Sequence, residues 1–164
     1  MQAISDILSF RYVETIREEE GGTYGAGVRV QTNKYPKGNY LLTVQFDCDP
    51  ENAERLTQIV LREIDVLRTE GPKDDQVRNF KENKLKTWKE SLQENNFWIS
   101  NLLNADFNGD AWDSFMEYPG LVNTVSPEIV KEAAARYFNG DNLIIITLLP
   151  SDLSKSVKNP LLKN

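Results

Sequence analysis

Apolar residues recur at helical spacing at the start of the chain. Three or four positions separate successive members, so they share one face of a helix. We therefore predict an amphipathic helix over residues 3–19, which Gly21 and Gly22 bring to an end. Its buried face consists of Ile4, Ile7, Leu8, Tyr12 and Ile16.

The periodicity then changes from helical to alternating. Residues 23–31 alternate small or apolar side chains with polar ones, which is typical of a strand. Residues 33–39 contain Pro36 and Gly38, two residue types favoured in turns, and residues 40–46 return to a strand pattern. The pattern predicts two antiparallel strands joined by a hairpin loop.

Two further stretches carry a strong helix-start signal. At Asp49-Pro50-Glu51 and at Ser126-Pro127-Glu128, an oxygen-bearing cap precedes a proline and an acid. The side-chain oxygen of the cap accepts a hydrogen bond from a free amide of the first turn. Proline fits there because the first residues of a helix do not need their N–H groups for helical hydrogen bonds. The acid is favoured by the positive end of the helix dipole. The predicted buried faces are Ala53, Leu56, Val60, Ile64 and Leu67 for the first helix, and Ile129, Ala133 and Tyr137, with Phe138 as a further candidate, for the last.

Between these two helices the sequence predicts more helix. One helix opens at residues 73–75, after Gly71-Pro72, and another covers residues 97–107. Aromatic residues at helical spacing belong to a core more often than to a binding site, so we expect Trp88 and Trp98 to be buried. Trp112 lies in a loop and is the best candidate for an exposed aromatic.

Residues 143–149 form the longest apolar run and predict a fully buried strand. The order of helix, strand, strand, several helices and strand indicates an α+β domain, with a mostly antiparallel sheet and helices packed on one face. Three strands make a narrow sheet, so we expect that a preceding first strand is lacking. Residues 1–150 are predicted to form a single domain, followed by a polar tail at residues 151–164.

Charge and hydropathy exclude several classes of protein. The 164 residues carry a net charge of -6 without a concentrated run of Lys and Arg, which argues against a nucleic-acid partner. The longest apolar run is too short to cross a bilayer, and residues 1–10 lack the basic and apolar pattern expected of a signal peptide. Cys48 is the only cysteine, which excludes an internal disulfide and favours a small buried residue on a strand.

The sequence contains no histidine. Catalytic zinc is almost always held by imidazole or thiolate ligands, so a complete zinc site cannot be built from this chain. Nucleophile systems that use histidine as the general base are excluded for the same reason. We expect no metal and no cofactor in this domain.

Residues 16–28, IREEEGGTYGAGV, combine a helix end, a glycine-containing turn and a tyrosine that opens the next strand. This run resembles the hallmark of the C-terminal half of M16 zinc metallopeptidases, the pitrilysin and insulinase type. Arg17 and Tyr24 are seven positions apart, as in that family. The resemblance extends over roughly residues 1–150. Other segments in the same register are residues 11–14, 71–77 and 137–144.

In that family, a His-x-x-Glu-His helix of the N-terminal half binds zinc, and the C-terminal half closes a chamber around the peptide. The resemblance implies that Arg17 and Tyr24 reach across this chamber toward the scissile bond. A tyrosine hydroxyl that donates to the developing oxyanion stabilises the transition state more than the ground state. A fixed guanidinium orients the backbone carbonyls of the peptide. Both residues are thus predicted to bind substrate, with Tyr24 as an accessory catalytic donor.

The chain lacks the His-x-x-Glu-His motif, so it matches only the C-terminal type. It is therefore predicted to be inactive alone, as the zinc-free part of a zinc metalloendopeptidase. The implied partners are peptide substrate and a zinc-bearing N-terminal-half M16 domain, in cis or in trans, which would hold the Zn²⁺. Bacterial members often lie in the cell envelope or periplasm, and that is the family expectation for the parent protein.

Other interpretations stay open. Local sequence alone favours Arg17 as a helix-end cation that pairs with Glu18 or Glu20, and Tyr24 as an ordinary strand aromatic. Only the joint motif favours the substrate-facing role. An inactive scaffold or assembly subunit of the same fold is the main alternative function, and a free-standing peptide-binding module is another.

Overall fold

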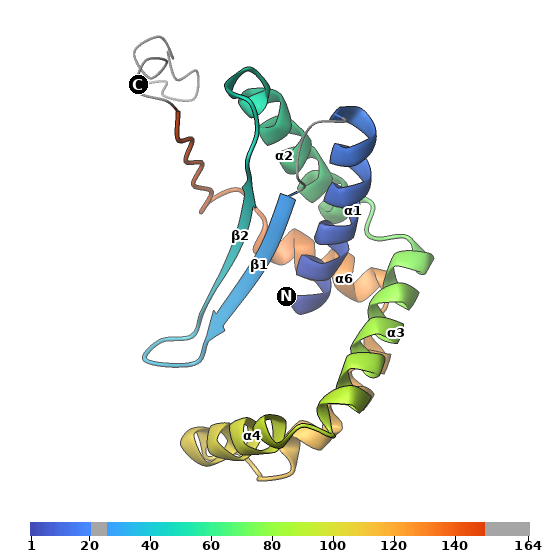
Figure 1. The fold of residues 1–164 in the computed structure, drawn as a ribbon, viewed down its shortest axis with the longest axis vertical. Coiled ribbons are helices and arrows are strands. Elements are labelled where there is room, and N and C mark those ends of the chain that lie inside the picture. Colours follow the sequence, from blue (N-terminus) through green and yellow to red (C-terminus); the bar gives the residue numbers. More distant parts are fainter. Residues whose placement is uncertain (21–25, 150–164) are drawn as a thin grey trace.

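Three helices and a β-hairpin form the centre of the molecule (Figure 1). The computed structural model describes residues 1–20 and 26–149, with the backbone alone for residues 16–20. The central helices are α1 (Gln2–Glu20), α2 (Ala53–Thr69) and α6 (Pro127–Tyr137). Helix α1 contacts both of the others and the first strand of the hairpin, so it is the element around which this part of the fold is packed.

The hairpin pairs β1 (Ala26–Asn33) with β2 (Asn39–Phe46) in antiparallel register. Ala26 lies opposite Phe46, and Asn33 lies opposite Asn39. Exposed residues alternate with more buried ones over residues 26–30 of β1 and 42–46 of β2, whereas the strand residues next to the loop are all exposed. Within the described chain, α1 packs against β1, and α1 and α2 lie on the same side of the hairpin (Figure 1). Helices and an antiparallel sheet together agree with the predicted α+β class. The residues of the covered face that pack against the core are Val28, Leu42, Val44 and Phe46.

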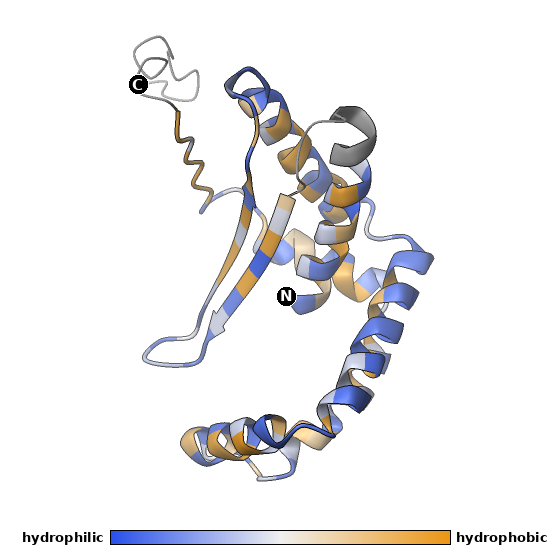
Figure 2. Ribbon diagram, viewed as in Figure 1, coloured by the Kyte–Doolittle hydropathy of each residue, from blue (hydrophilic) through white to orange (hydrophobic). Residues whose placement is uncertain are grey.

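The hydrophobic core lies between α1, α2 and α6. Apolar positions shown in orange in Figure 2 line the facing sides of α1 and α2. Each of these helices alone would leave an apolar stripe in water, and packing removes both stripes from solvent. The largest side chains that are fully buried are Tyr12, Ile4, Ile7, Leu8, Leu56 and Leu67.

The remaining helices form an arm that extends away from this core (Figure 1). They are α3 (Asp74–Ser91), α4 (Asn95–Asn108), the short 3₁₀ helix η2 (Ser114–Glu117) and α5 (Tyr118–Thr124). An aromatic cluster joins them, with ring centroids 5.1 to 6.4 Å apart. Its members are Trp88, Phe97, Trp98, Phe115 and Tyr118.

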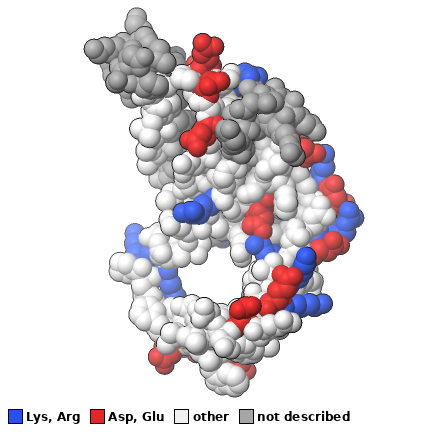
Figure 3. Space-filling view, in the orientation of Figure 1, with Lys and Arg blue, Asp and Glu red and all other residues white. Residues whose placement is uncertain are grey.

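The tip of the hairpin touches the far end of the arm. Lys34 Nζ lies 3.4 Å from Asp110 Oδ1, and the Tyr35 and Phe107 rings meet edge to face at 6.0 Å. Figure 3 shows an opening through the molecule between the hairpin and the arm. Because Lys34 and Asp110 are about half exposed, this ion pair contributes little to holding the hairpin tip against the arm.

The structure confirms the first predicted helix and the antiparallel hairpin. The side chain of Ile16 in the predicted buried face, and residues 23–25 of the first predicted strand, lie outside the described residues. The structure also confirms one of the two predicted helix caps. The Ser126 hydroxyl accepts from the Ile129 amide at 3.3 Å, as predicted for the start of α6. The Asp49 side chain makes no capping hydrogen bond. A 3₁₀ turn, η1 (Pro50–Asn52), leads into α2 instead, so the position of this start was right and its capping mechanism was wrong.

The predicted buried face of α6 was displaced by one residue. Ile129 is 50% exposed, whereas Val130 and Ala134 are buried. Ala133, Tyr137 and Phe138 are only half-buried. Two adjacent apolar stripes run along this helix, and the contact of α6 with α2 decides which one turns inward.

The prediction of a buried strand at residues 143–149 was wrong. The described chain contains a sheet of two strands only, and these residues belong to neither. Ile144, Ile146 and Leu148 are 82%, 80% and 93% exposed. A buried strand needs neighbouring strands that bind its amides and carbonyls, and the described residues supply none here.

The predicted burial of the arm was also too strong. Trp98 is 38% exposed and Trp88 is half-buried, both in the aromatic cluster rather than in the main core. Ile99 and Leu103 of α4 are exposed as well. Trp112, at 69% exposure, is on the surface as predicted. Among the described helices, none is long and apolar enough to span a membrane.

Candidate functional site

The two predicted site residues lie at the boundary of what the structure describes. Arg17 belongs to the helical backbone of α1, but its side chain is outside the described residues. Tyr24 is also outside them. Helix α1 up to Glu20 and strand β1 from Ala26 are described, so the supports on both sides of the predicted site are known. Their contacts show how these two flanking elements are held in the fold.

Helix α1 is held first by its apolar side chains. Ile4, Ile7 and Leu8 are at most 1% exposed, and complete burial of such a side chain contributes roughly 1.5–3 kcal/mol. Tyr12, also fully buried, donates its hydroxyl to the backbone oxygen of Val60 at 3.1 Å. This contact ties the middle of α1 to α2.

The Tyr12 hydroxyl is kept protonated by its surroundings. Burial raises the pKa of Tyr12, the negative charge of Glu63 raises it further, and the positive charge of Arg11 acts weakly in the opposite direction. The hydroxyl therefore acts as a neutral hydrogen-bond donor within the core. It has no access to substrate and is not a candidate for the catalytic tyrosine.

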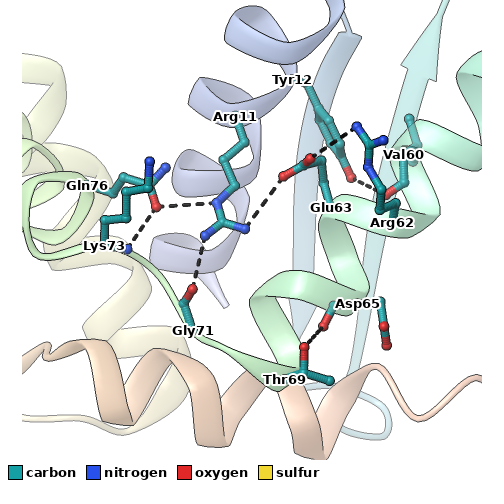
Figure 4. A network of polar contacts seen from close by, with 10 residues as sticks. All are labelled: Arg11, Tyr12, Val60, Arg62, Glu63, Asp65, Thr69, Gly71, Lys73 and Gln76. Atoms are coloured by element: carbon teal, nitrogen blue, oxygen red, sulfur yellow. Dashed lines mark hydrogen bonds and ion pairs between the residues drawn. The ribbon is translucent and has the colours of Figure 1, made fainter.

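A second set of contacts surrounds Arg11, whose guanidinium reaches three segments (Figure 4). Its Nη2 atom donates to the Gly71 oxygen at 3.0 Å, and its Nε atom donates to Gln76 Oε1 at 3.3 Å. Its Nη1 atom lies 3.6 Å from Glu63 Oε2. The three partners lie in α2, in the connection after α2, and in α3. Arg11 thus joins α1 to both following helices.

The partners of Arg11 are themselves held in place. Gln76 Oε1 also accepts from the backbone amide of Lys73 at 3.1 Å, which caps the start of α3. Gly71 has φ of +88°, and a Cβ atom there would lie 3.2 Å from the Lys131 Cβ of α6. A residue with a side chain would be strained at this position, so glycine allows the turn that presents its carbonyl to Arg11.

On the other side of the predicted site, β1 begins in the core. Ala26 is only 7% exposed and pairs with Phe46 of β2. Strand β1 also contacts α1 directly. The segment that contains Tyr24 is therefore bounded by two elements that pack on one another.

Other parts of the described chain contain a shallow groove and no cluster of metal ligands. A shallow groove of about 460 Å³ lies between α3 and the α5–α6 connection, and Lys81 donates to the Asn123 oxygen at 3.0 Å beside it. Within the described residues, no three His, Cys, Asp or Glu side chains gather as a metal site would require.

Cys48 was predicted to be a small buried residue on a strand. It lies just beyond β2, and it is half-buried and packed against the core. Burial, followed by the charges of Asp49 and Asp47, raises the pKa of its thiol. A thiol of raised pKa is a poor nucleophile and a poor metal ligand at neutral pH.

Sequence reasoning missed the role of Arg11. A signal was present, because Arg11 is four positions after Ile7 and three after Leu8, on the apolar face of the helix. A charged residue on that face must find partners in the core. The sequence could not show which partners these are, since Glu63 and Gly71 are far away along the chain.

Comparisons with known proteins agree with this architecture. Residues 1–84 match the family model described as the peptidase M16 inactive domain. A zinc protease PQQL-like protein of Arabidopsis thaliana is 29% identical over 105 residues, covering 61% of this chain and 11% of the relative. The crystal structure of the periplasmic protease PqqL from Escherichia coli superposes with a TM-score of 0.69 at 18% identity. That superposition covers 84% of this chain and 15% of the larger one, so it shows the fold.

Proposed function

The chain belongs to the peptidase M16 inactive-domain family, and from that premise we propose that it is the zinc-free part of a zinc metalloendopeptidase. In this role it encloses peptide substrate together with a zinc-bearing M16 domain, and it does not hydrolyse peptides alone. The family match carries the proposal, because residues 1–84 include α1, the hairpin, α2 and the start of α3.

The chain spans about a tenth of the curated relative and 15% of the solved one. Both of those proteins are proteases by name, and a zinc-bearing M16 domain is the partner that this chain needs for the same chemistry. The zinc of that domain would activate water, and this chain would contribute substrate contacts. The periplasmic relative also supports an envelope or periplasmic location for the parent protein.

Within this function, Tyr24 is the proposed donor to the oxyanion that forms when water attacks the peptide carbonyl. A donor placed where negative charge develops lowers the barrier, because it binds the transition state more strongly than the substrate. Arg17 is proposed to bind and orient the backbone carbonyls of the peptide. The packing of α1 against β1 supports this assignment, since it bounds the segment between the two residues.

The test measures hydrolysis of quenched fluorescent peptides by this chain, by the zinc-bearing M16 domain of its parent, and by the two mixed. We expect hydrolysis in the mixture only. Tyr24→Phe should lower kcat about a hundredfold, because one oxyanion donor is lost. Tyr35→Phe, which changes an exposed tyrosine of the hairpin loop, is the matched control and should leave kcat unchanged.

Arg17→Ala should act differently from Tyr24→Phe. We expect mainly an increase in KM, because Arg17 is proposed to bind the substrate in both its ground and transition states. Arg78→Ala, at an exposed position of α3, is the control. Unchanged kinetics for both Arg17→Ala and Tyr24→Phe would refute the proposed roles.

An inactive scaffold or assembly subunit is the second candidate function. The exposure of Ile144, Ile146 and Leu148 favours it, because apolar surfaces of this kind mark sites of association. A stable complex with the zinc-bearing domain that has no peptidase activity at any substrate concentration would select this alternative.

A further inference from the structure

Arg11 is the one charged side chain that is buried in the part of the chain the structure describes, at 7% exposure. Its guanidinium is divided among a carbonyl, an amide oxygen and a carboxylate, each from a different segment (Figure 4). Nη1 has no hydrogen-bond partner among the described residues and is held near Glu63 by charge attraction. Glu63 is shared with Arg62, whose Nη2 lies 3.8 Å away.

Burial of an ion pair is a costly way to fill a site. A guanidinium and a carboxylate must be removed from water, and well-packed apolar side chains of similar volume often give equal or greater stability. Hydrogen bonds, however, have preferred directions, whereas apolar contacts do not. The apolar stripe of α1 that includes Ile4 and Leu8 therefore restricts the rotation of the helix less sharply than hydrogen bonds do. The contacts of Arg11, together with the hydrogen bond from Tyr12 to Val60, set that rotation.

The orientation set at Arg11 is carried along the helix to Arg17. Helix α1 is continuous from Gln2 to Glu20, and Arg17 follows Arg11 by six residues, or about 9 Å of helix. Asp6 also binds α3, through Lys84 Nζ at 2.8 Å, but that ion pair is more exposed and farther from Arg17. A rotation of α1 at Arg11 therefore changes where the helix presents position 17.

We infer that Arg11 is a positioning residue, which fixes the rotation of α1 on α2 and α3 and thereby places Arg17 for peptide binding. Its guanidinium is held by the carboxylate of Glu63, the backbone oxygen of Gly71 and the side-chain oxygen of Gln76. The inference rests on the proposed function, in which Arg17 binds the peptide substrate. Positioning errors of about 1 Å can lower catalysis by two orders of magnitude. The effect of weakening the contacts of Arg11, which we call the Arg11 clamp, should therefore be measurable.

The first test is a double-mutant cycle in the mixture with the zinc-bearing domain. Arg11→Met should raise KM about tenfold, while Arg78→Met leaves it unchanged. If Arg11 acts through Arg17, Arg11→Met should have no further effect in an Arg17→Ala background. Additive effects of the two changes would overturn the inference. Should Arg11→Met not fold, Glu63→Gln, which removes the partner charge at equal size, takes its place in the cycle.

A second variant separates positioning from stability. Arg11→Met combined with Glu63→Met removes the buried guanidinium together with its carboxylate partner, and it should recover the stability that Arg11→Met alone loses. We expect this double variant to keep the raised KM of Arg11→Met. Both variants should also bind a fluorescent peptide with a higher Kd than the wild type, measured in the mixture after zinc is removed with a chelator. Recovery of wild-type KM and Kd together with stability would show that Arg11 has only a structural role.

The third test does not depend on activity. Spin labels at Glu18→Cys in α1 and Arg78→Cys in α3, in a Cys48→Ser background, report the distance between the two helices. Arg11→Met should shift or broaden the distance distribution, and an unchanged distribution would overturn the inference. Normal kinetics for Arg17→Ala combined with a broadened distribution would refute the role of Arg17 in the proposed function while supporting the clamp.

Discussion

The apolar face of α1 and residues 143–149 are both strongly hydrophobic in sequence, yet the structure treats them in opposite ways. Leu8 is 0% exposed, whereas Leu148 is 93% exposed. The difference lies in their surroundings, because α1 meets α2, α6 and β1, whereas the described chain offers no strand to pair with residues 143–149. Hydrophobicity makes burial favourable, but a segment is buried only where other elements provide a surface to pack against.

The largest expected effect comes from a matched pair of leucines. Leu8→Ala should lower the free energy of unfolding by about 2–5 kcal/mol, because it removes buried methyl groups and leaves a cavity. Leu148→Ala should change it by less than about 0.5 kcal/mol, because that side chain is in solvent. Urea unfolding followed by circular dichroism measures both values. Equal losses would show that residues 143–149 are packed in solution.

A smaller effect concerns the hydroxyl of Tyr12. Tyr12→Phe removes its hydrogen bond to Val60 and should cost about 1 kcal/mol in unfolding free energy at neutral pH. Phe10→Leu, at a 45% exposed position of the same helix, is a control that should have almost no effect. Urea titrations at pH 7 measure both.

The same tyrosine also predicts a dependence on alkaline pH. Its pKa is raised in the folded state above the ordinary value of 10.0, so above that pH the unfolded chain loses a proton that the folded chain retains. Its contribution is fully present below about pH 10 and is lost as the pH rises toward the folded pKa. Stability of the wild type should fall more steeply above pH 10 than stability of Tyr12→Phe. Parallel pH profiles would contradict the burial of this hydroxyl.

The smallest expected effect on stability is at Ile146. Ile146→Lys should leave the free energy of unfolding within about 0.5 kcal/mol of wild type, because the side chain is 80% exposed. It should nevertheless reduce self-association at high concentration, since it places a charge in an uncharged apolar run. Sedimentation velocity measures the change. The corresponding substitution at Ile7, which is fully buried, should prevent folding.

The local features of the fold were predictable from the sequence. Spacing of apolar residues predicted the first helix and the burial of Ile4, Ile7, Leu8 and Tyr12, and turn residues with alternation predicted the hairpin. These features depend on contacts between residues close together in the chain. The capping bond of Ser126 was predictable for the same reason, whereas that of Asp49 did not form because a 3₁₀ turn took the place of the first α-helical turn.

The site was only partly predictable. The motif around Arg17 and Tyr24 indicated a family, and the match over residues 1–84 agrees with it. Both predicted side chains lie outside the described residues, so their roles remain predictions. Arg11 was not predicted, because its partners come from segments more than fifty positions away.

The sequence by itself determined that this domain cannot bind catalytic zinc through histidine, that α1 has an apolar face, and that a hairpin follows it. These conclusions need only composition and local spacing. Tertiary structure alone decided that Val130 rather than Ile129 faces the core, that Arg11 is buried, and that residues 143–148 are exposed. Each of those outcomes depends on which distant segment is present to exclude water or accept a hydrogen bond, and residue spacing along one chain segment does not contain that information.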